Sequence, residues 1–209
     1  GSIQKLFSRN TDIVTFCEDK VLTVLSNKDA LFNADGNANV TATNRVLGST
    51  TPLAGGYGIS KDPESFANHV NRCYFTDKQR GAVLTLQGGS ITNISDLGMK
   101  DYFGDKLGEL VTSAIVGMYD ARKECYNLNI RDVSKGNTIL LANNMGIEPV
   151  TLTYTDQVNG WTCFKSWNAE NGVSLNNEFY TFKNGSLWQH HSNNTRNNFH
   201  GEQYDSRVT

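Results

Sequence analysis

The sequence predicts an all-β protein with one short helix, in which antiparallel hairpins follow one another along the chain. Five segments repeat a strand, a polar turn and a return strand, with almost no helical periodicity between them. Glycine is abundant, with 19 residues, whereas proline is scarce, with 3, which suits many tight turns between short strands. This succession favours an antiparallel sandwich, barrel or propeller over an α/β fold, and by itself it does not separate β-propeller blades from a β-sandwich.

The hairpins differ in spacing, although each has an aromatic residue shortly before its turn. They cover residues 12–25, 72–95, 114–130, 150–167 and 178–193, and their aromatic residues are Phe16, Phe75, Tyr119, Tyr154 and Phe182. Successive aromatic residues are 59, 44, 35 and 28 positions apart, so the pattern is not a clean sequence repeat. A blade of four short strands needs about 40 to 50 residues. A chain of 209 residues therefore has room for about four blades.

The last hairpin ends in His190 and His191, two of the four histidines in the chain. Asn184 and Gly185 supply the positive φ angles of a tight turn, and strand-forming residues precede and follow them. Successive side chains on a strand point to opposite faces, so we expect the two imidazoles to diverge and not to share one metal ion. We interpret the pair as the end of a hairpin.

One segment is predicted to be a long loop. Residues 27–60 are rich in Asn, Ala, Gly and Thr, a composition typical of loops. Within it, Asn33, Asp35 and Asn37 place oxygen ligands at alternating positions, as a calcium loop does. Ala38 stands where such a loop needs glycine for its sharp turn, so we do not predict a calcium site.

One segment is predicted to be helical. Residues 99–113 place Leu107 and Leu110 at helical spacing. Asp101 or Asp105 is the expected N-cap.

The sequence carries no motif of a nucleophile, a phosphate-binding loop or a metal site. We therefore predict a protein that is not an enzyme and has no catalytic, cofactor-binding or metal-binding residues and no cofactor. The turn aspartates are expected to cap backbone amides. They are Asp19, Asp77, Asp120 and Asp156. On one rim of a propeller they would instead converge on a carbohydrate site, because glycosidases use paired carboxylates.

The four cysteines are interpreted as free thiols that behave as small apolar residues in strands. They are Cys17, Cys73, Cys125 and Cys163. None of them forms a CxxC pair, and one long-range disulfide is the alternative.

Charge and hydropathy exclude two classes of partner. The net charge is −2, so no global basic field draws the chain to nucleic acid. No apolar run approaches the length of about 18 residues that spans a bilayer, so we expect no membrane anchor.

Three passages together resemble the large tail proteins of short-tailed bacteriophages, of the nozzle, tail tubular B or muzzle type. They read "YGISKDPESFANHVNRCYFTDKQRGAVLTLQGGSITNISDLGMKDYF", "GWTCFKSWNAENGVSLNNEFYTFKNGSLWQHH" and "TRNNFHGEQYDSRVT". The similarity runs from Ile3 to Thr209 and keeps the order of the passages. No single short motif carries it.

The resemblance implies a β-propeller subunit of the virion, made in the host cytoplasm. Such subunits form a homo-oligomeric ring at the tail end, for example a hexamer. DNA passes through the lumen without sequence-specific binding, and neighbouring tail proteins are the other partners. These proteins are much longer than 209 residues, so residues 1–209 would form one β-rich, propeller-like domain or segment. Residues 27–60 and the tail from Asn193 are the expected contacts between subunits.

Two other functions fit the same pattern. One is a carbohydrate-binding or glycan-cleaving β-propeller that acts on a host surface polysaccharide. The other is a propeller scaffold that binds cellular proteins.

Overall fold

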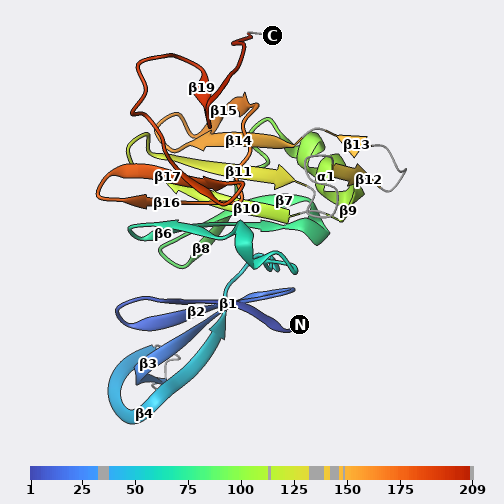
Figure 1. Ribbon diagram of the computed structural model, residues 1–209. Helices are drawn as coiled ribbons and strands as arrows, with labels where there is room; N and C mark the ends of the chain where they lie inside the picture. Colours follow the sequence, from blue (N-terminus) through green and yellow to red (C-terminus); the bar gives the residue numbers. More distant parts are fainter. Residues whose placement is uncertain (33–37, 113, 132–138, 142–145, 148, 208–209) are drawn as a thin grey trace.

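In the computed structural model, antiparallel β-sheets are stacked face to face and one α-helix of the described residues lies beside them (Figure 1). The structure describes residues 1–32, 38–112, 114–131, 139–141, 146–147 and 149–207. The predicted all-β class with one short helix is confirmed. In each of the four larger sheets the strands lie side by side in chain order.

We number the larger sheets in chain order. The first sheet contains β1 (Ile3–Ser8), β2 (Asp12–Cys17), β3 (Val21–Phe32) and β4 (Ala38–Pro52). The second contains β5 (Ala67–His69), β6 (Arg72–Asp77), β7 (Ala82–Gln87) and β8 (Ser90–Asn93). The third contains β10 (Ala114–Asp120), β11 (Cys125–Arg131), β14 (Val150–Thr155) and β15 (Gly160–Lys165). The fourth contains β16 (Asn171–Leu175), β17 (Glu178–Lys183) and β18 (Ser186–Gln189).

Smaller elements connect these sheets. Strands β9 (Leu110–Thr112), β12 (Ile139–Leu141) and β13 (Gly146–Ile147) form a small sheet, and β19 (Asn198–Phe199) pairs with β20 (Glu202–Gln203). The helix is α1 (Lys100–Glu109), and two 3-10 turns are η1 (Pro63–Ser65) and η2 (Lys78–Arg80).

The five predicted hairpins are present as β2–β3, β6–β7, β10–β11, β14–β15 and β17–β18. Local turn chemistry explains them. In β6–β7 the Asp77 side chain accepts a hydrogen bond from the Arg80 amide, and Gly81 closes the turn at a φ of 63°. In β17–β18, Asn184 and Gly185 both have positive φ angles, as a two-residue hairpin turn requires.

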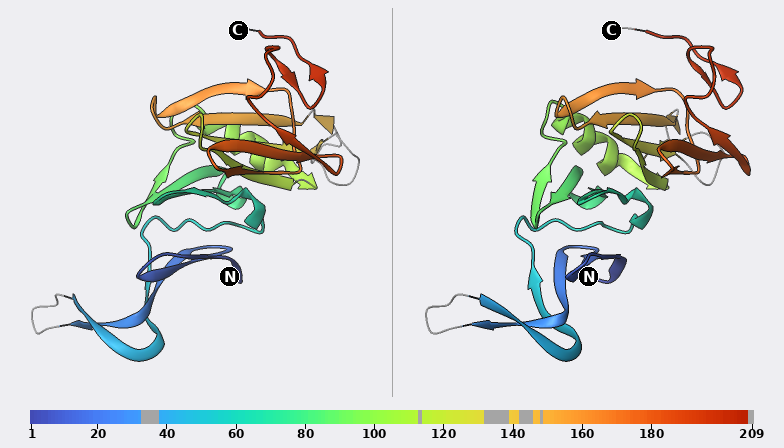
Figure 2. Two further views of the ribbon diagram at one scale, coloured as in Figure 1. Left: turned by 60° about the vertical axis from the view of Figure 1, so that its left-hand side comes forward. Right: turned by 90° about the vertical axis from the view of Figure 1, so that its left-hand side faces the viewer.

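The prediction of a long loop over residues 27–60 is wrong for residues 27–32 and 38–52, which form strands. Residues 53–60 are irregular as predicted, and residues 33–37 lie outside the described residues. Strands β3 and β4 pair from Leu22 opposite Pro52 to Phe32 opposite Ala38, and they extend as a two-stranded ribbon (Figure 2). Strand β2 stops pairing at Leu25, so the rest of the ribbon has no third strand beside it. Backbone hydrogen bonds maintain such a ribbon without an apolar side-chain pattern, which is why its composition resembles that of a loop.

The helix prediction is confirmed with a later start and an earlier end. The helix covers Lys100–Glu109, whereas the predicted segment was residues 99–113. Residues Leu110–Thr112 instead form β9, in which Thr112 pairs with Leu140 of β12. Asn33, Asp35 and Asn37, the positions compared with a calcium loop, lie outside the described residues.

The predicted helix cap is wrong. Met99 occupies the N-cap position without a side-chain hydrogen bond, and Asp101 lies in the first turn. The helix is held by packing instead, because Phe103 and Leu107, one turn apart, are both fully buried.

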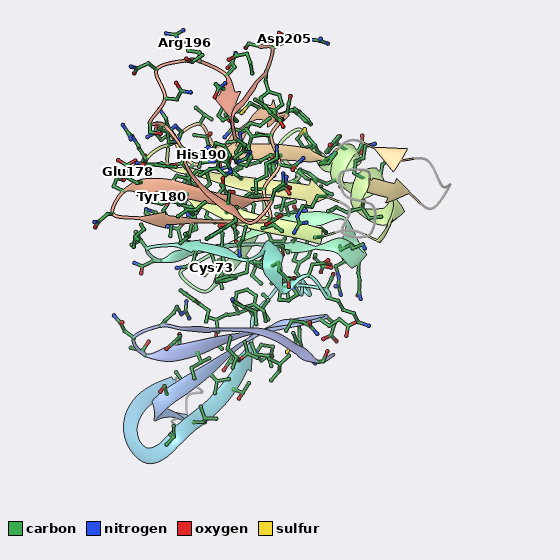
Figure 3. All side chains as sticks on the ribbon, viewed as in Figure 1. Cys73, Glu178, Tyr180, His190, Arg196 and Asp205 are labelled. Carbon is green, nitrogen blue, oxygen red and sulfur yellow. The ribbon has the colours of Figure 1, made fainter. Side chains whose placement is uncertain are left out.

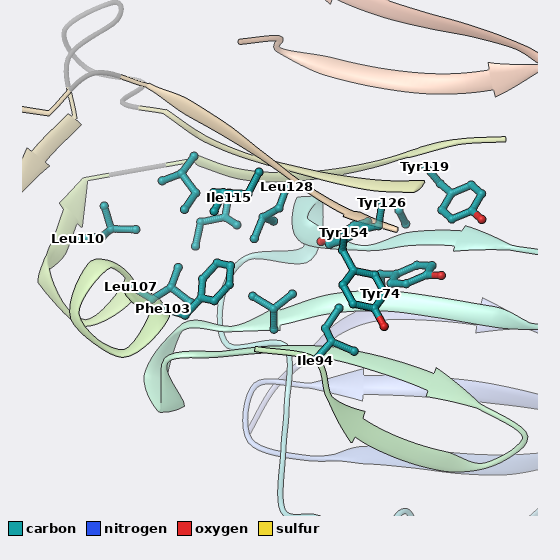
Figure 4. Close-up of a cluster of buried hydrophobic side chains, with 14 residues drawn as sticks. Tyr74, Ile94, Phe103, Leu107, Leu110, Ile115, Tyr119, Tyr126, Leu128 and Tyr154 are labelled. Carbon is teal, nitrogen blue, oxygen red and sulfur yellow. The ribbon is translucent and has the colours of Figure 1, made fainter. Parts of the chain in front are cut away.

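Three clusters of buried side chains fill the spaces between successive sheets. Between the first and second sheets, the rings of Phe16 and Phe75 meet edge to face with centres 5.0 Å apart. Between the second and third sheets, Tyr74 stacks on Tyr126 at 4.8 Å, and α1 adds Phe103 (Figure 4). The cluster between the third and fourth sheets contains Val116, Met118, Trp167, Ala169 and Phe179. The core is thus divided by the sheets into three layers.

Val70 lies in the two-residue turn between β5 and β6 with a φ of 51°, and it is 74% exposed. A β-branched side chain is strained in this left-handed region, which glycine adopts freely. We expect Val70→Gly to raise the free energy of unfolding by about 1 kcal/mol, measured by urea denaturation. The matched control is Val158→Gly, because Val158 is 64% exposed without a positive φ. The control is expected to lower stability slightly, and a loss of stability in Val70→Gly would contradict the strain argument.

Candidate functional site

The first strands of the four larger sheets, β1, β5, β10 and β16, contribute residues to the lining of one cavity of about 740 Å³. We call it the first-strand cavity. Each of these strands pairs with one neighbour only, so each leaves one backbone edge without a ladder partner. The cavity is therefore bordered by edge strands from all four sheets.

Two glycines allow the first strands to approach closely. A Cβ atom on Gly117 of β10 would lie 2.0 Å from the backbone oxygen of Ser65. A Cβ atom on Gly172 of β16 would lie 2.7 Å from the Met118 sulfur. Glycine inside a strand often marks a close backbone approach, and this signal was present at Gly117 in "AIVGMYD". Our reading of the sequence missed it.

The lining of the cavity is largely polar. It includes the amide side chains of Gln4, Asn68, Asn171 and Asn177. The Lys5 ammonium lies 5.3 Å from the centre of the Phe66 ring, within cation–π range. Glu64 is the only carboxylate among the described lining residues. The arrangement offers donors and acceptors to a polar ligand but not the pair of carboxylates that glycosidases use.

A tyrosine network lies next to the cavity and joins the second and third sheets. Asp156 accepts hydrogen bonds from the hydroxyls of Tyr74 at 2.5 Å and Tyr119 at 3.2 Å, and it forms an ion pair with Arg72 at 2.5 Å. His69 stacks on Tyr119 with ring centres 4.4 Å apart. Burial, together with the Asp156 carboxylate, raises the pKa of both phenols. The tyrosines therefore act as neutral donors that hold the sheets together, not as nucleophiles.

The two adjacent histidines diverge, as predicted. His190, which is labelled in Figure 3, is only 6% exposed and its Nε2 lies 2.7 Å from the Thr181 hydroxyl. In contrast, His191 Nε2 lies 2.6 Å from the Asp120 carboxylate. His200, from the C-terminal segment, places its Nε2 2.9 Å from the same Thr181 hydroxyl. The hydroxyl has one proton and two lone pairs, so it donates to at most one of the two imidazoles and accepts from the other. Thr181 thereby ties the C-terminal segment to the fourth sheet.

Protonation of either imidazole would place a positive charge in a buried site. Burial, together with the positive charges that His200 and His191 would carry, lowers the pKa of His190 to about 4. Burial, with a smaller contribution from the Lys183 charge, lowers the pKa of His200 to about 4. Both imidazoles are therefore neutral at pH 7. The described residues contain no group of three or more His, Cys, Asp or Glu side chains suited to a metal ion.

The turn aspartates have separate partners. The capping prediction is confirmed for Asp77, which accepts from the Arg80 amide at 3.2 Å, and for Asp120, which accepts from the Lys123 amide at 3.1 Å. Asp156 belongs to the tyrosine network instead. Each of these three carboxylates is thus held in its own set of hydrogen bonds.

The cysteines are free thiols. Three of them are buried, namely Cys17, Cys73 and Cys125, whereas Cys163 is exposed. Burial raises the pKa of Cys73 to about 12 and that of Cys125 to about 11. Both thiols are protonated at neutral pH and act as apolar side chains.

The two ends of the stack of sheets are apolar. On the first sheet, Ile3 is 63% exposed and Leu6 is 58% exposed. The fourth sheet exposes a larger set of apolar side chains, which comprises Val173, Leu175, Phe182 and Leu187. Apolar side chains grouped on a sheet face are typical of a protein interface.

Comparison with protein-family models gives no match, and comparison with curated protein sequences gives no significant match. Among the described helices, none has the length and apolar character needed to cross a bilayer.

The contact between Gly117 and Ser65 gives a stability prediction. We expect Gly117→Ala to lower the free energy of unfolding by about 3 kcal/mol or more, because the new methyl group would overlap a buried carbonyl. Gly108→Ala is the matched control, since nothing lies within 4 Å of a Cβ placed on this helical residue. That substitution should raise stability by about 0.5–1 kcal/mol. Equal effects of the two substitutions in urea denaturation would contradict the close approach.

The buried histidines give a pH prediction. Between pH 6.5 and about 4 the unfolded chain binds more protons than the folded chain, so stability should fall as the pH falls through this range. The loss from His190 is on the order of 3 kcal/mol. In His190→Gln, which keeps a hydrogen-bonding side chain but does not titrate, the fall should be smaller. His69→Gln is the control. Identical pH profiles for all three proteins in thermal denaturation would contradict the prediction.

Proposed function

We propose that this chain is a non-enzymatic structural segment of a bacteriophage tail protein of the nozzle, tail tubular B or muzzle type. The observation that carries the proposal is the set of four meander sheets whose first strands contribute to one cavity. Propeller blades are such sheets, arranged around a central channel. A sandwich has two sheets, whereas here four follow one another along the chain. This geometry supports the propeller reading, which is also the fold that the resemblance implies.

The apolar ends of the stack support a protein that works in an assembly. Leu6 at one end and Leu187 at the other are more than half exposed, at 58% and 59%. Such faces favour a homo-oligomeric ring in the virion, for example a hexamer, in contact with neighbouring tail proteins.

The charge of the chain supports passage of DNA without binding. The net charge is −2 over 209 residues. Fixed positive charge would hold the phosphates of a passing duplex, because phosphate contacts supply most non-specific affinity for DNA. A mildly acidic chain therefore suits a conduit.

A carbohydrate-binding propeller remains the second candidate, and the first-strand cavity favours it. The cavity combines amide side chains such as Asn68 and Asn171 with the aromatic side chains of Phe66 and Tyr119. Amides and aromatic rings together bind sugar hydroxyls and sugar faces. The presence of Glu64 alone supports binding rather than cleavage, since cleavage uses two carboxylates.

Electron microscopy of native phage particles tests the proposal. An antibody against this chain should label the tail end, and symmetry classification should give a closed ring with a lumen wide enough for duplex DNA. Labelling of a surface spike without an axial channel would contradict the proposal and favour the second candidate. Binding to a glycan array would then identify the sugar.

A further inference from the structure

The end of the β17–β18 hairpin and the chain that follows it form a second cavity, of about 330 Å³. We call it the C-terminal cavity. Its described lining residues all lie between Trp188 and Gly201, and one of them, His190, is labelled in Figure 3. Sites for small molecules have volumes of about 300 to 1,000 Å³, so this cavity lies at the lower end of the range and suits a small ligand.

The C-terminal cavity is polar, but its described lining residues include no Asp, Glu, Lys or Arg. Two of its histidines, His190 and His200, are neutral at pH 7, because burial is the main cause that lowers the pKa of each to about 4. The third, His191, directs its Nε2 to the Asp120 carboxylate, which lies outside the lining. A phosphate, a carboxylate or an ammonium group would therefore find no counter-charge in the lining, which favours an uncharged ligand.

Two buried nitrogen atoms of the lining residues have no hydrogen-bond partner within the described part of the chain. They are Nε1 of Trp188 and Nδ1 of His200. The indole nitrogen can only donate, whereas Nδ1 of a neutral imidazole donates or accepts according to its tautomer, and Nε2 of His200 is already engaged by Thr181. A hydroxyl group both donates and accepts, so it can serve either nitrogen. A ligand rich in hydroxyl groups therefore suits these two side chains.

Hydrogen bonds within the loop hold the C-terminal cavity in shape. The Asn193 side chain donates to the Asn198 side-chain oxygen at 3.1 Å and accepts from the Thr195 amide at 2.8 Å. Gly201 has a φ of 78°, which glycine adopts freely, and a Cβ atom placed on it would lie 3.4 Å from the Trp188 ring. The cavity is thus formed before a ligand binds, so binding does not require the loop to become ordered.

We propose that the C-terminal cavity binds one neutral sugar unit of a carbohydrate. The rings of Trp188 and Phe199 offer apolar surface to the C–H groups of a pyranose, and the side chains of Ser192 and Asn197 offer hydrogen-bonding groups to its hydroxyls. A nucleotide fits less well, because its phosphate would meet no Lys or Arg in the described lining. This binding site goes beyond the proposed tail function and does not rest on it. It also shares no described lining residue with the first-strand cavity.

NMR titration of the purified chain with neutral methyl glycosides tests this site. The panel comprises the methyl glycosides of glucose, galactose, mannose, rhamnose, fucose and N-acetylglucosamine. At least one of them should shift the indole N–H signal of Trp188 and the amide signals of Asn197 and Gly201, with a dissociation constant on the order of 1 mM. Glucuronic acid should bind roughly tenfold more weakly or worse, because its carboxylate would lose hydration without gaining a counter-charge.

Two substitutions locate the bound sugar. Trp188→Phe keeps an aromatic ring but removes the indole donor, so the dissociation constant, followed at the Gly201 amide, should rise by roughly fivefold or more. Asn68→Ala is the matched control, because Asn68 is an exposed amide residue that lines the first-strand cavity. This control should leave the affinity unchanged. Circular dichroism establishes that the variants are folded, and Asn193→Ala, which removes the hydrogen bonds that close the loop, replaces Trp188→Phe if the latter is not.

Several outcomes would overturn the sugar site. They are the absence of shifts with every glycoside in the tens-of-millimolar range, binding of glucuronic acid as tight as that of the neutral glycosides, and unchanged affinity in the folded cavity variant. Loss of binding in Asn68→Ala would also overturn it, because the sugar would then occupy the first-strand cavity. None of these outcomes bears on the labelling of phage tails, so the sugar site and the tail function are tested separately.

Discussion

The arrangement of the second and third sheets depends on one buried residue, Ser65. Its side-chain oxygen accepts a hydrogen bond from the Thr76 amide of β6 at 3.1 Å, and its backbone oxygen accepts one from the Tyr126 hydroxyl of β11 at 2.8 Å. The same backbone oxygen occupies the space that a side chain at Gly117 would need. Ser65 thus joins strands of two sheets, and it brings β10 to the position in which it borders the first-strand cavity.

Polar contacts near the edges of the sheets complement this buried connection. The Asp156 carboxylate accepts hydrogen bonds from Tyr74 of the second sheet and Tyr119 of the third. The Thr181 hydroxyl forms hydrogen bonds with His190 and with His200 of the C-terminal segment. Apolar packing alone tolerates sliding of one sheet over another, but a hydrogen bond between buried groups requires one geometry. The cavity therefore takes its shape from hydrogen bonds between sheets as much as from the strands that line it.

The hairpins and the helix were predictable because they depend on the chemistry of neighbouring residues. Contacts between residues that are distant in the sequence were not predictable. The turn at Asn184 and Gly185 is encoded by adjacent residues. The helical spacing of Leu107 and Leu110 likewise indicated the helix, although Leu110 begins β9. The β3–β4 ribbon was missed because its strands are joined by backbone hydrogen bonds, which composition does not report. The contact between Tyr74 and Asp156 spans 82 positions, and no pattern within either strand indicates it.

The two end sheets expose apolar side chains, which include Leu6 and Leu187. A sheet with one face in water normally alternates apolar and polar side chains. Strand β2 does not, because Ile13 faces outward between Asp12 and Val14, and Leu22 and Val24 on β3 extend that outer face. Each end sheet is therefore built like an internal sheet of a longer stack, with two faces suited to burial. Burial of the exposed apolar side chains on these outer faces, among them Leu6 and Leu187, would be favourable.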